Sequence, residues 1–455
     1  MALPERRTFI AGAAAALATS GFPILGANDR INIGQVGIGG RGTNHIDYYS
    51  SLSSECRVAA VCDVNQTARE RGIAHIKRLG GAPPAEYEDM RKMFASKDID
   101  AVSITTPNHW HALAAIWACQ AGKDVYVEKP ACHNLFEALQ EVAAARKYNR
   151  MVQVGSQSRS IAHKMKAMDL LRQGIIGNVY HARGLCYRRR FSIGHTPDAP
   201  VPAGLDWDRF LGPAQLKPYS KNKFAYNWHW FWDTGNGDIG NQGVHEMDMC
   251  LWGLGRGGWP ALVSAVGGKF IWEDDQETPN TLQTTFDFGG QQITFDVRNL
   301  PTLPEGTGPV RPSYTGNIYF GDLGFMVVEP SSFQVYKSAV GNSISGDAAR
   351  GAGAGRAEKY EKTMEVAAAE KAQWTTQPHM QNWFQAIRAR DYKLLHADIA
   401  IGARAASFVH LANISYRVGH SVKVDQSTGH FIADDQANAL FSRNYREPYV
   451  VPVTV

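Results

Sequence analysis

The chain has 455 residues, of which 44% are hydrophobic and 20% charged, and its formal net charge is +4 at pH 7. These proportions are ordinary for a globular protein, and the length suits two or three domains. The densest basic block, Arg188-Arg189-Arg190, is too short to favour nucleic-acid binding. After the first 27 residues no apolar run is long enough to span a membrane. The composition therefore favours neither a nucleic-acid-binding protein nor a mature chain with a membrane span.

The N-terminus predicts an export signal. Arg6-Arg7-Thr8-Phe9-Ile10 precedes a weakly apolar, alanine-rich run that ends near Ala27. A pair of arginines before such a run is typical of bacterial twin-arginine (Tat) signals. We therefore expect residues 1–27 to be a signal peptide and the mature chain to be periplasmic or exported.

Between residues 28 and 155, short apolar runs alternate with helical patterns. Buried parallel strands are predicted at 31–36, 58–62, 101–105, 125–127 and 151–154, and helices at 43–50, 66–79, 111–121 and 135–148. Such alternation is typical of βαβ units with right-handed crossovers. It predicts an α/β domain built on a doubly wound parallel sheet.

Residues 156–455 have a different pattern. Strand-like runs follow one another at 179–187, 262–270, 281–288, 292–297 and 317–328, and several alternate polar and apolar residues. This pattern predicts an α+β domain with a mostly antiparallel, open sheet. Residues 339–370, rich in Gly and Ala, are predicted to be a surface loop insertion, and helices are expected at 379–389 and 397–418.

A glycine-rich turn, Gly37-Ile38-Gly39-Gly40-Arg41-Gly42, follows the first predicted strand. In this G-x-G-x-x-G pattern the first glycine allows a tight turn, the second lets the backbone approach a pyrophosphate, and the third lets the helix pack against the sheet. Asp63 ends the second strand, where a carboxylate accepts from ribose hydroxyls and repels a 2′-phosphate. The sequence therefore predicts a Rossmann domain that binds NAD in preference to NADP.

Three further segments accompany this turn: Thr105-Thr106-Pro107-Asn108-His109-Trp110-His111, Glu128-Lys129-Pro130, and residues 237–248, GDIGNQGVHEMD. In this order, and with the C-terminal segments 379–384 and 444–446, they resemble the glucose–fructose oxidoreductase and inositol dehydrogenase (Gfo/Idh/MocA) family. The resemblance covers nearly all of the mature chain. It implies a Rossmann domain followed by a mostly antiparallel α/β domain, with the substrate held between them against the nicotinamide.

The resemblance also implies catalytic residues. In the family, the lysine of the EKP motif and the histidine of the second-domain motif act on the substrate hydroxyl, and Lys129 and His245 occupy those positions. Oxidising a secondary alcohol requires removal of the O–H proton as hydride leaves carbon, and desolvation and like charge suit a buried lysine to that task. Many dehydrogenases of the family have an aspartate four residues before the histidine. Asn241 stands there in this chain, and an amide can orient a hydroxyl but cannot relay a proton as a carboxylate does.

The remaining site residues are assigned by their positions. The family places the loop after the third strand beside the nicotinamide ribose, so Thr106, Asn108 and His111 are expected cofactor contacts. Glu128 of the EKP motif and Gln157, just past the last strand of the first domain, are expected to face the same cleft. The aromatic run 226–233 suits both sugar stacking and the core of the second domain. The expected substrate residues are Tyr187, Arg188, Tyr226, Trp228, His229 and Asp248, and Asp248 either orients His245 or caps local structure.

The sequence predicts no metal site. The six cysteines form no CxxC pair and most lie in apolar runs, which is typical of buried free thiols. His109 and His111 have no third partner in view, and His245-Glu246 lacks the second histidine of a zincin.

Together these features favour an exported NAD-dependent oxidoreductase that acts on a hydroxyl of a sugar, polyol or glycoside. Because no pool of free NAD exists in the periplasm, we expect a tightly bound cofactor and a cycle that couples an oxidation to a reduction. A redox-neutral NAD-dependent glycosidase, which oxidises, eliminates and then reduces, is the alternative. A non-catalytic sugar-binding relative is the third hypothesis, kept open by Asn241. The expected partners are a carbohydrate and, through the open sheet, further copies of the chain.

Overall fold

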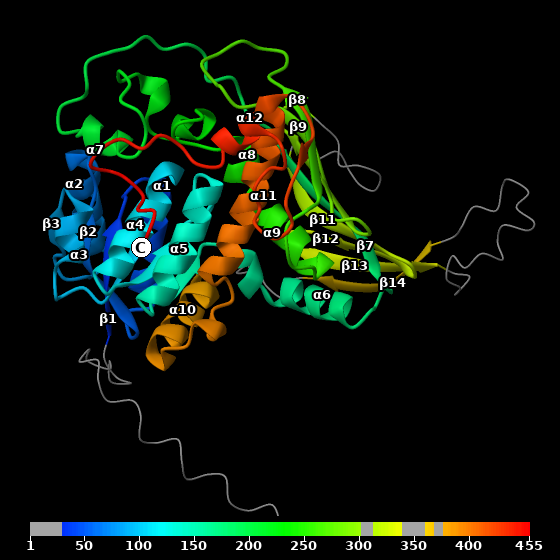
Figure 1. The fold of residues 1–455 in the computed structure, drawn as a ribbon. Helices are drawn as coiled ribbons and strands as arrows, with labels where there is room; N and C mark the ends of the chain where they lie inside the picture. Colours follow the sequence, from blue (N-terminus) through cyan, green and yellow to red (C-terminus); the bar gives the residue numbers. More distant parts are fainter. Residues whose placement is uncertain (1–29, 302–312, 339–359, 368–375) are drawn as a thin grey trace, which may run out of the picture.

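The computed structural model describes residues 30–301, 313–338, 360–367 and 376–455 (Figure 1). The first domain holds a six-stranded parallel sheet in the order β3-β2-β1-β4-β5-β6. Its strands are β1 (Ile31–Val36), β2 (Cys56–Cys62), β3 (Ala85–Tyr87), β4 (Ala101–Ile104), β5 (Asp124–Val127) and β6 (Val152–Val154). The strand order reverses between β1 and β4, which is where a doubly wound sheet binds its ligand. The predicted doubly wound sheet is confirmed.

Helices connect these strands: α1 (Gly40–Ser51), α2 (Gln66–Arg78), α3 (Met90–Phe94), α4 (Asn108–Gln120) and α5 (Leu135–Lys147). The short strand β3 and helix α3 were not predicted, because neither is long enough to show a period. A single turn, η1 (Gln157–Ser160), and α6 (Ala162–Arg172) then lead into the second domain.

The second domain is built on a nine-stranded sheet in the order β14-β13-β12-β11-β7-β10-β9-β8-β15. Its strands are β7 (Val179–Arg188), β8 (Leu262–Gly268), β9 (Thr281–Asp287), β10 (Gln292–Arg298), β11 (Ser313–Gly321), β12 (Gly324–Val328), β13 (Ser332–Ser338), β14 (Tyr360–Ala367) and β15 (Val422–Lys423). β7 and β10 pair in parallel and the other pairs are antiparallel, which confirms a mostly antiparallel sheet.

Two predictions in this sheet were wrong in detail. The single strand predicted at 317–328 is the hairpin of β11 and β12, which turns at Asp322-Leu323. The predicted loop at 339–370 contains β14, which pairs with β13. Its sequence alternates apolar and charged side chains only from Met364 to Val366, which is too short to predict a strand beside the Gly- and Ala-rich residues that precede it. Residues 339–359 and 368–370 lie outside the described residues.

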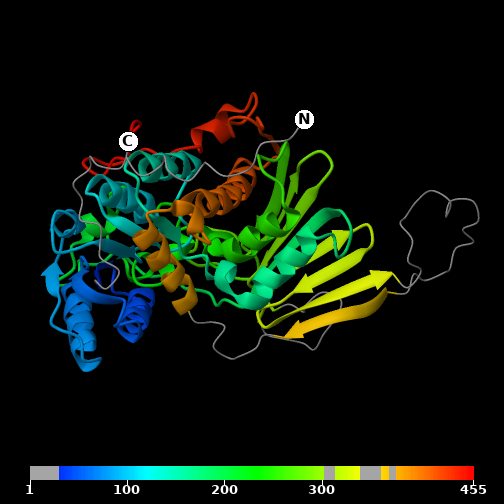
Figure 2. The same ribbon diagram turned by 90° about the horizontal axis from the view of Figure 1, so that it is seen from below.

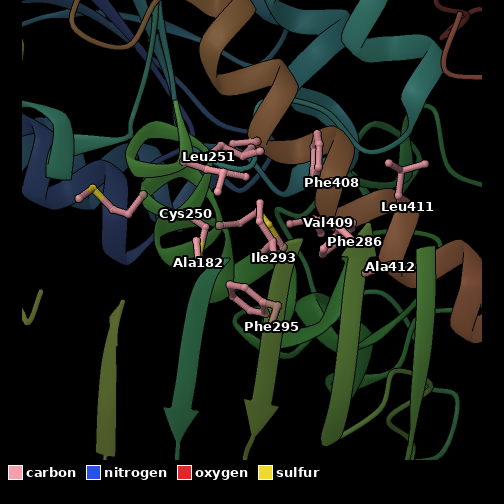
Figure 3. Close-up of a cluster of buried hydrophobic side chains, with 14 of the residues drawn as sticks. Ala182, Cys250, Leu251, Phe286, Ile293, Phe295, Phe408, Val409, Leu411 and Ala412 are labelled. Atoms are coloured by element: carbon pink, nitrogen blue, oxygen red, sulfur yellow. The ribbon is translucent and has the colours of Figure 1, made fainter. Parts of the chain in front are cut away.

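One face of the nine-stranded sheet is covered by α6, α9 (Gly243–Leu254) and α11 (Ile399–Val418), which form its hydrophobic core (Figures 1 and 2). Figure 3 shows how Leu251 from α9 and Phe408 from α11 lie over side chains of β9 and β10, such as Phe286 and Phe295. Of these helices, α9 and α11 carry few charged residues, because most of their side chains are buried.

The C-terminal part of the chain also contributes to the first domain. Trp383 and Phe384 of α10 (Gln377–Ala389) belong to the same buried cluster as Ile31 and Ile33 of β1. Tyr449, near the chain end, packs into the cluster under β4 and α4. The core of the first domain therefore extends beyond residues 28–155, the range expected for it, since apolar helices can dock wherever a face is open.

A long connection between β7 and α8 (Gly237–Asn241), residues 189–235, crosses back over the first domain, and we call it the roof segment. It contains α7 (Trp207–Leu211), η2 (Lys221–Lys223) and η3 (Asn227–Trp230), and α7 lies beside the first domain in Figure 1. Asn65 and Leu205 form a β-bridge, and the Asp206 N–H donates to the Val64 carbonyl at 3.0 Å. The roof segment is thereby attached to the loop after β2. The remaining elements are η6 (Tyr392–Leu394) and α12 (Asp435–Ala439).

Candidate active site

A cavity of about 720 Å³ lies at the carboxyl ends of the parallel strands. Its walls come from the glycine-rich turn, the loop after β2, the start of α4, the EKP motif, the roof segment and the end of α8. Fourteen residues predicted for the site line it: Gly37, Gly39, Gly40, Arg41, Asp63, Thr106, Asn108, His111, Glu128, Lys129, Tyr226, Trp228, His229 and Asn241. Segments far apart in the sequence thus meet in one space.

The glycine-rich turn fits a pyrophosphate. Gly37 has a φ of +79°, a conformation that side chains disfavour. A Cβ on Gly42 would lie 2.0 Å from the Gly37 carbonyl oxygen, whereas a Cβ on Gly39 would meet no atom within 4 Å. The third glycine is therefore needed for packing, and the second faces open space at the start of α1, where backbone N–H groups can bind phosphate.

Asp63 is held for a ribose by backbone donors. The Ile38 N–H donates to its Oδ2 at 2.6 Å and the Asn65 N–H to its Oδ1 at 2.9 Å. Burial raises the pKa of this carboxyl, and the two N–H donors and the nearby Arg69 and Arg71 counteract the rise. Ile38 itself is fully buried and contacts the site through its backbone alone.

The loop at the start of α4 offers a free hydroxyl. Thr106 Oγ1 is buried and has no hydrogen-bond partner among the described residues, so it can bind a ligand in the cavity that it lines. The His111 ring lies between two carbonyls, 2.7 Å from Pro130 O and 2.8 Å from Thr106 O. Burial lowers the pKa of His111, whereas the two carbonyl acceptors act in the opposite direction. His111 therefore joins the loop to the EKP motif.

Glu128 is the centre of a buried polar cluster. Its Oε1 accepts from Arg41 Nε at 2.7 Å and lies 3.0 Å from His45 Nε2. The Arg41 guanidinium and the His45 hydrogen bond hold the pKa of Glu128 well below its usual range, although burial alone would raise it. The Gln157 amide lies against Glu128 and Arg41, outside the cavity lining. The ion pair between Arg41 and Glu128 thus connects the glycine-rich turn to the EKP motif.

Lys129 follows Glu128 and is partly buried in the cavity wall. Its Nζ donates to the Asn241 carbonyl oxygen at 2.6 Å. Burial lowers the pKa of Lys129, with the Glu128 carboxylate acting in the opposite direction. A lysine with a lowered pKa has a larger unprotonated fraction at neutral pH, as a proton-accepting group requires.

His245 lies in the first turn of α9, partly buried, outside the residues that line the cavity. Burial, together with the charge of Lys129, lowers the pKa of His245 to about 3. The ring is therefore neutral at physiological pH. It is close enough to Lys129 to feel its charge, and its catalytic role stays a prediction.

The aromatic run divides between cavity and core. Tyr226, Trp228 and His229 line the cavity, whereas Trp230 and Phe231 are buried beneath it. The His229 ring stacks on Trp228 with centroids 3.6 Å apart, and its Nδ1 lies 2.5 Å from the Tyr226 carbonyl oxygen. Burial lowers the pKa of His229 to about 3, so this side chain is also neutral.

Three residues expected at the substrate lie elsewhere. Tyr187 is fully buried in β7 against Tyr314 and Arg298. Arg188 is exposed, and its Nη1 donates to Gln242 Oε1 at 3.3 Å. Asp248 is buried and accepts from Arg159 Nε at 2.8 Å, so this pair joins η1 to α9. None of the three lines the cavity: Tyr187 and Arg188 lie on opposite faces of β7, and Asp248 is paired with Arg159.

The sequence did not predict a second polar group, which lies buried next to the cavity residue Asn241. Asp238, at the start of α8, accepts from Arg190 Nη2 at 2.6 Å and from Asn299 Nδ2 at 2.6 Å. Arg190 is in the basic triplet and Asp238 in the GDIGNQG motif, but nothing in the sequence indicates that they pair. The roof residues Arg209, Phe210 and Phe224 were also missed, since no periodic pattern marks the roof segment.

Within the described residues no helix has the length and apolarity needed to cross a membrane. In the same part of the chain, no group of three His, Cys, Asp or Glu side chains is placed to hold a metal ion. All six cysteines are buried free thiols, as predicted.

Family models match this chain in two parts. The NAD-binding Rossmann fold of the oxidoreductase family matches residues 31–156, and the C-terminal alpha/beta domain of that family matches residues 156–296 and 362–451. The chain belongs to the Gfo/Idh/MocA oxidoreductase family. Its first domain is accordingly an NAD-binding Rossmann domain, and the glycine-rich turn, Asp63 and the free Thr106 hydroxyl fit that cofactor.

Curated relatives of this Gfo/Idh/MocA protein include glycosyl hydrolase family 109 proteins. The one from Shewanella putrefaciens is 30% identical over 157 residues, and one from Shewanella baltica is 29% identical over 157 residues. Each match covers 34% of this chain and 34% of the relative, so the chain spans about a third of the length of the curated relatives it matches.

Solved structures share the fold over most of the chain. Levoglucosan dehydrogenase in complex with NADH and levoglucosan is 20% identical, with a TM-score of 0.62 over 88% of this chain and 100% of that one. An oxidoreductase domain protein from Kribbella flavida is 19% identical, with a TM-score of 0.64 over 87% of this chain and 99% of that one.

Proposed function

We propose that the protein is an NAD-dependent oxidoreductase that acts on a hydroxyl group of a carbohydrate. The observation that carries this proposal is the place of Lys129, which lines the same cavity as the phosphate-binding turn. A proton-accepting amine beside a dinucleotide site suits oxidation of an alcohol. Levoglucosan dehydrogenase, a structural neighbour, was solved with NADH and a sugar derivative, which supports a carbohydrate as the substrate class.

The chemistry divides between cofactor and protein. NAD, when bound, accepts the hydride from the substrate carbon. Lys129 takes the hydroxyl proton in its unprotonated form and returns it in the reverse direction. His245, neutral because of its lowered pKa, orients the hydroxyl or the lysine. Asn241 holds the Lys129 ammonium through its backbone carbonyl.

We also propose that the cofactor stays bound through the whole cycle. The roof segment supports this, because it covers the cavity with Phe210 and Phe224 and is attached to the loop after β2. The Gln66 N–H donates to the Gly204 carbonyl at 2.8 Å, next to the β-bridge. A cofactor under such a cover leaves slowly, so each oxidation is paired with a reduction on the same enzyme.

A redox-neutral glycosidase is the second candidate. It is favoured by the family 109 glycosyl hydrolases among the curated relatives. In that route, transient oxidation of a ring hydroxyl by bound NAD would acidify the neighbouring C–H, and elimination would release the aglycone. Water would then add to the double bond that elimination leaves, and reduction of the ketone would restore NAD and give the free sugar. The route consumes no free cofactor, as a tightly held NAD requires.

For the location of the protein we propose export by the twin-arginine pathway, supported by Arg6-Arg7 before the alanine-rich run. Replacing both arginines by lysine should leave the protein in the cytoplasm, as measured by cell fractionation. Equal amounts of the Arg6→Lys/Arg7→Lys and wild-type proteins in the periplasm would contradict this.

We further propose a homo-oligomer formed through the open face of the nine-stranded sheet, where Tyr180 and Val266 are exposed, to be tested by light scattering.

One experiment separates the candidate functions. The purified protein should release NAD on denaturation, and the loaded protein should be mixed with a panel of sugars and glycosides. Bound NADH formed in a single turnover supports the oxidoreductase, whereas free sugar released without net NADH supports the glycosidase. Neither signal, with normal sugar binding, would leave the non-catalytic relative.

Lys129→Met is the variant for this assay. It should keep its NAD but lose about 10²- to 10⁴-fold in turnover, the usual contribution of a proton-transferring side chain. Lys166→Met, on the exposed face of α6, is the matched control and should behave as wild type. Full turnover by Lys129→Met would exclude this lysine as the proton acceptor.

A further inference from the structure

Tyr226 occupies an unusual position in the cavity wall. Its side chain is 51% exposed, and its Oη accepts two hydrogen bonds, from Asn241 Nδ2 at 2.9 Å and from Arg190 Nη1 at 3.2 Å. Arg190 is itself fixed by the buried carboxylate of Asp238, which accepts from it through both oxygens. The phenol oxygen is therefore held by two rigid donors.

Both of these partners can only donate. An arginine guanidinium and the nitrogen of a side-chain amide have no lone pair to offer, so the Tyr226 hydrogen must point away from both of them. No acceptor for this hydrogen is found among the described residues. Because Tyr226 lines the cavity, its O–H is left available to a ligand there.

This arrangement gives a reason for an asparagine at position 241, where many dehydrogenases of the family have an aspartate. Its Nδ2 donates both to Tyr226 Oη and to Asp238 Oδ1, the latter at 3.2 Å. An aspartate at this position would accept the Tyr226 hydrogen and turn it away from the cavity. It would also place a second carboxylate against Asp238, at a cost in like-charge repulsion. An amide is therefore what keeps the tyrosine hydroxyl directed at the substrate.

We infer that Tyr226 is a specificity-determining residue that donates a hydrogen bond to a substrate oxygen next to the hydroxyl handled by Lys129. The inference rests on the proposed function for the identity of the ligand. Lys129 Nζ contacts the backbone oxygen of Asn241, and Tyr226 contacts its side chain, so the two groups lie on either side of one residue. Such a pair suits two neighbouring hydroxyls, as on a pyranose ring, and the substrate class is a vicinal diol of a sugar. Arg190 and Asn241 are positioning residues for Tyr226.

The test combines each protein variant with each deoxy sugar, as in a double-mutant cycle in which the second change is made in the ligand. Binding to the NAD-loaded protein is measured by calorimetry. The probes are methyl glucopyranosides and galactopyranosides with their 2-, 3- and 4-deoxy analogues. Tyr226→Phe should weaken binding of a parent sugar by about 3- to 10-fold, the value of one net hydrogen bond. It should leave unchanged the binding of the one analogue that lacks the paired oxygen. Tyr180→Phe, on an exposed part of β7, is the matched control and should alter neither.

A second variant separates hydroxyl direction from ring packing. Asn241→Asp keeps the tyrosine ring but reverses its hydrogen bond, so it should show the same sugar discrimination as Tyr226→Phe while retaining NAD. If Tyr226→Phe weakens every analogue equally, or Asn241→Asp binds all of them as wild type does, the inference is overturned.

The outcomes also separate this inference from the proposed function. Sugar binding with the expected cycle but no NADH formation would overturn the oxidoreductase and keep the role of Tyr226. NADH formation without the expected pattern of binding changes would support the oxidoreductase and overturn the role of Tyr226. A wild-type protein that binds none of the pyranosides overturns the inference, whatever alcohol it oxidises.

Discussion

At the scale of single residues, the glycines of the phosphate-binding turn differ in what they are for. Gly42 is needed because a Cβ would overlap the Gly37 carbonyl, whereas Gly39 has open space in front of it. Gly42 is thus required by the packing of the protein itself, whereas Gly39 is required by the ligand. The sequence motif does not distinguish these two roles.

This difference predicts two separable defects. Gly42→Ala should lower the free energy of unfolding of the cofactor-free protein by about 1–3 kcal/mol, since the added methyl group forces the turn and α1 apart. Gly39→Ala should leave that value unchanged and weaken NAD binding, because the methyl group fills the space for the pyrophosphate. Urea unfolding of the apoprotein and NAD titration would measure the two effects. An apoprotein equally destabilised by both substitutions would contradict the assignment.

At the scale of elements, the roof segment decides how the cofactor site is closed. Its own small core stacks Trp207 on Phe210 with ring centroids 4.8 Å apart and includes Leu205 and Leu211. His109 and Trp110 of α4 are hydrogen-bonded to the Phe210 carbonyl, at 2.9 and 3.1 Å. The roof segment is thus held to both sides of the cavity through side chains as well as backbone.

Trp207→Ala should therefore loosen the roof segment and speed NAD release. The loss of a buried tryptophan costs on the order of 3–5 kcal/mol locally, which is enough to raise the dissociation rate of NAD at least about tenfold. Stopped-flow displacement of NAD, or retention through gel filtration, would measure it. Phe333→Ala, in the distant core of β13, controls for general destabilisation and should release NAD at the wild-type rate. Equal release rates in both variants would contradict a retaining role.

At the scale of the whole molecule, many buried histidines are held neutral. Burial lowers the pKa of His109, His229 and His245 to about 3, and that of His45, His379 and His410 to about 4. Unfolding restores a pKa near 6.5, so below that pH the unfolded chain binds more protons and the folded state loses stability as the pH falls. Glu137 and Glu246, whose pKa burial raises to about 7, act in the opposite direction and offset part of the loss.

We expect the melting temperature to fall as the pH is lowered from 6.5 to 4. Each uncompensated histidine should lower the free energy of unfolding with a limiting slope of about 1.4 kcal/mol per pH unit. His410→Gln removes one such group and should flatten the dependence of stability on pH. His430→Gln, at an exposed position, is the matched control. Calorimetry across this pH range would measure both, and the same pH dependence in His410→Gln as in wild type would contradict the account.

The fold could be predicted to the extent that its signals are local. The strands of the first sheet other than β3, the glycine-rich turn and the EKP motif each depend on neighbouring residues, and the sheet order follows from right-handed connections. Contributions from distant parts of the chain left no such signal. The docking of α10 on the first domain, the roof segment and strand β14 depend on which apolar or unpaired surfaces remain open after folding.

The sequence by itself determined the family, the Rossmann sheet and the motif residues of the cleft, such as the glycine-rich turn, Asp63 and Lys129, because motif chemistry and periodicity depend on consecutive positions. Only the tertiary structure decided which of the candidate side chains line the cavity. It placed Tyr187 and Asp248 away from the cavity and brought Arg190, Asp238 and Asn241 together around Tyr226. Hydrogen-bond direction depends on partners that are distant in sequence, and no pattern of neighbouring residues encodes it.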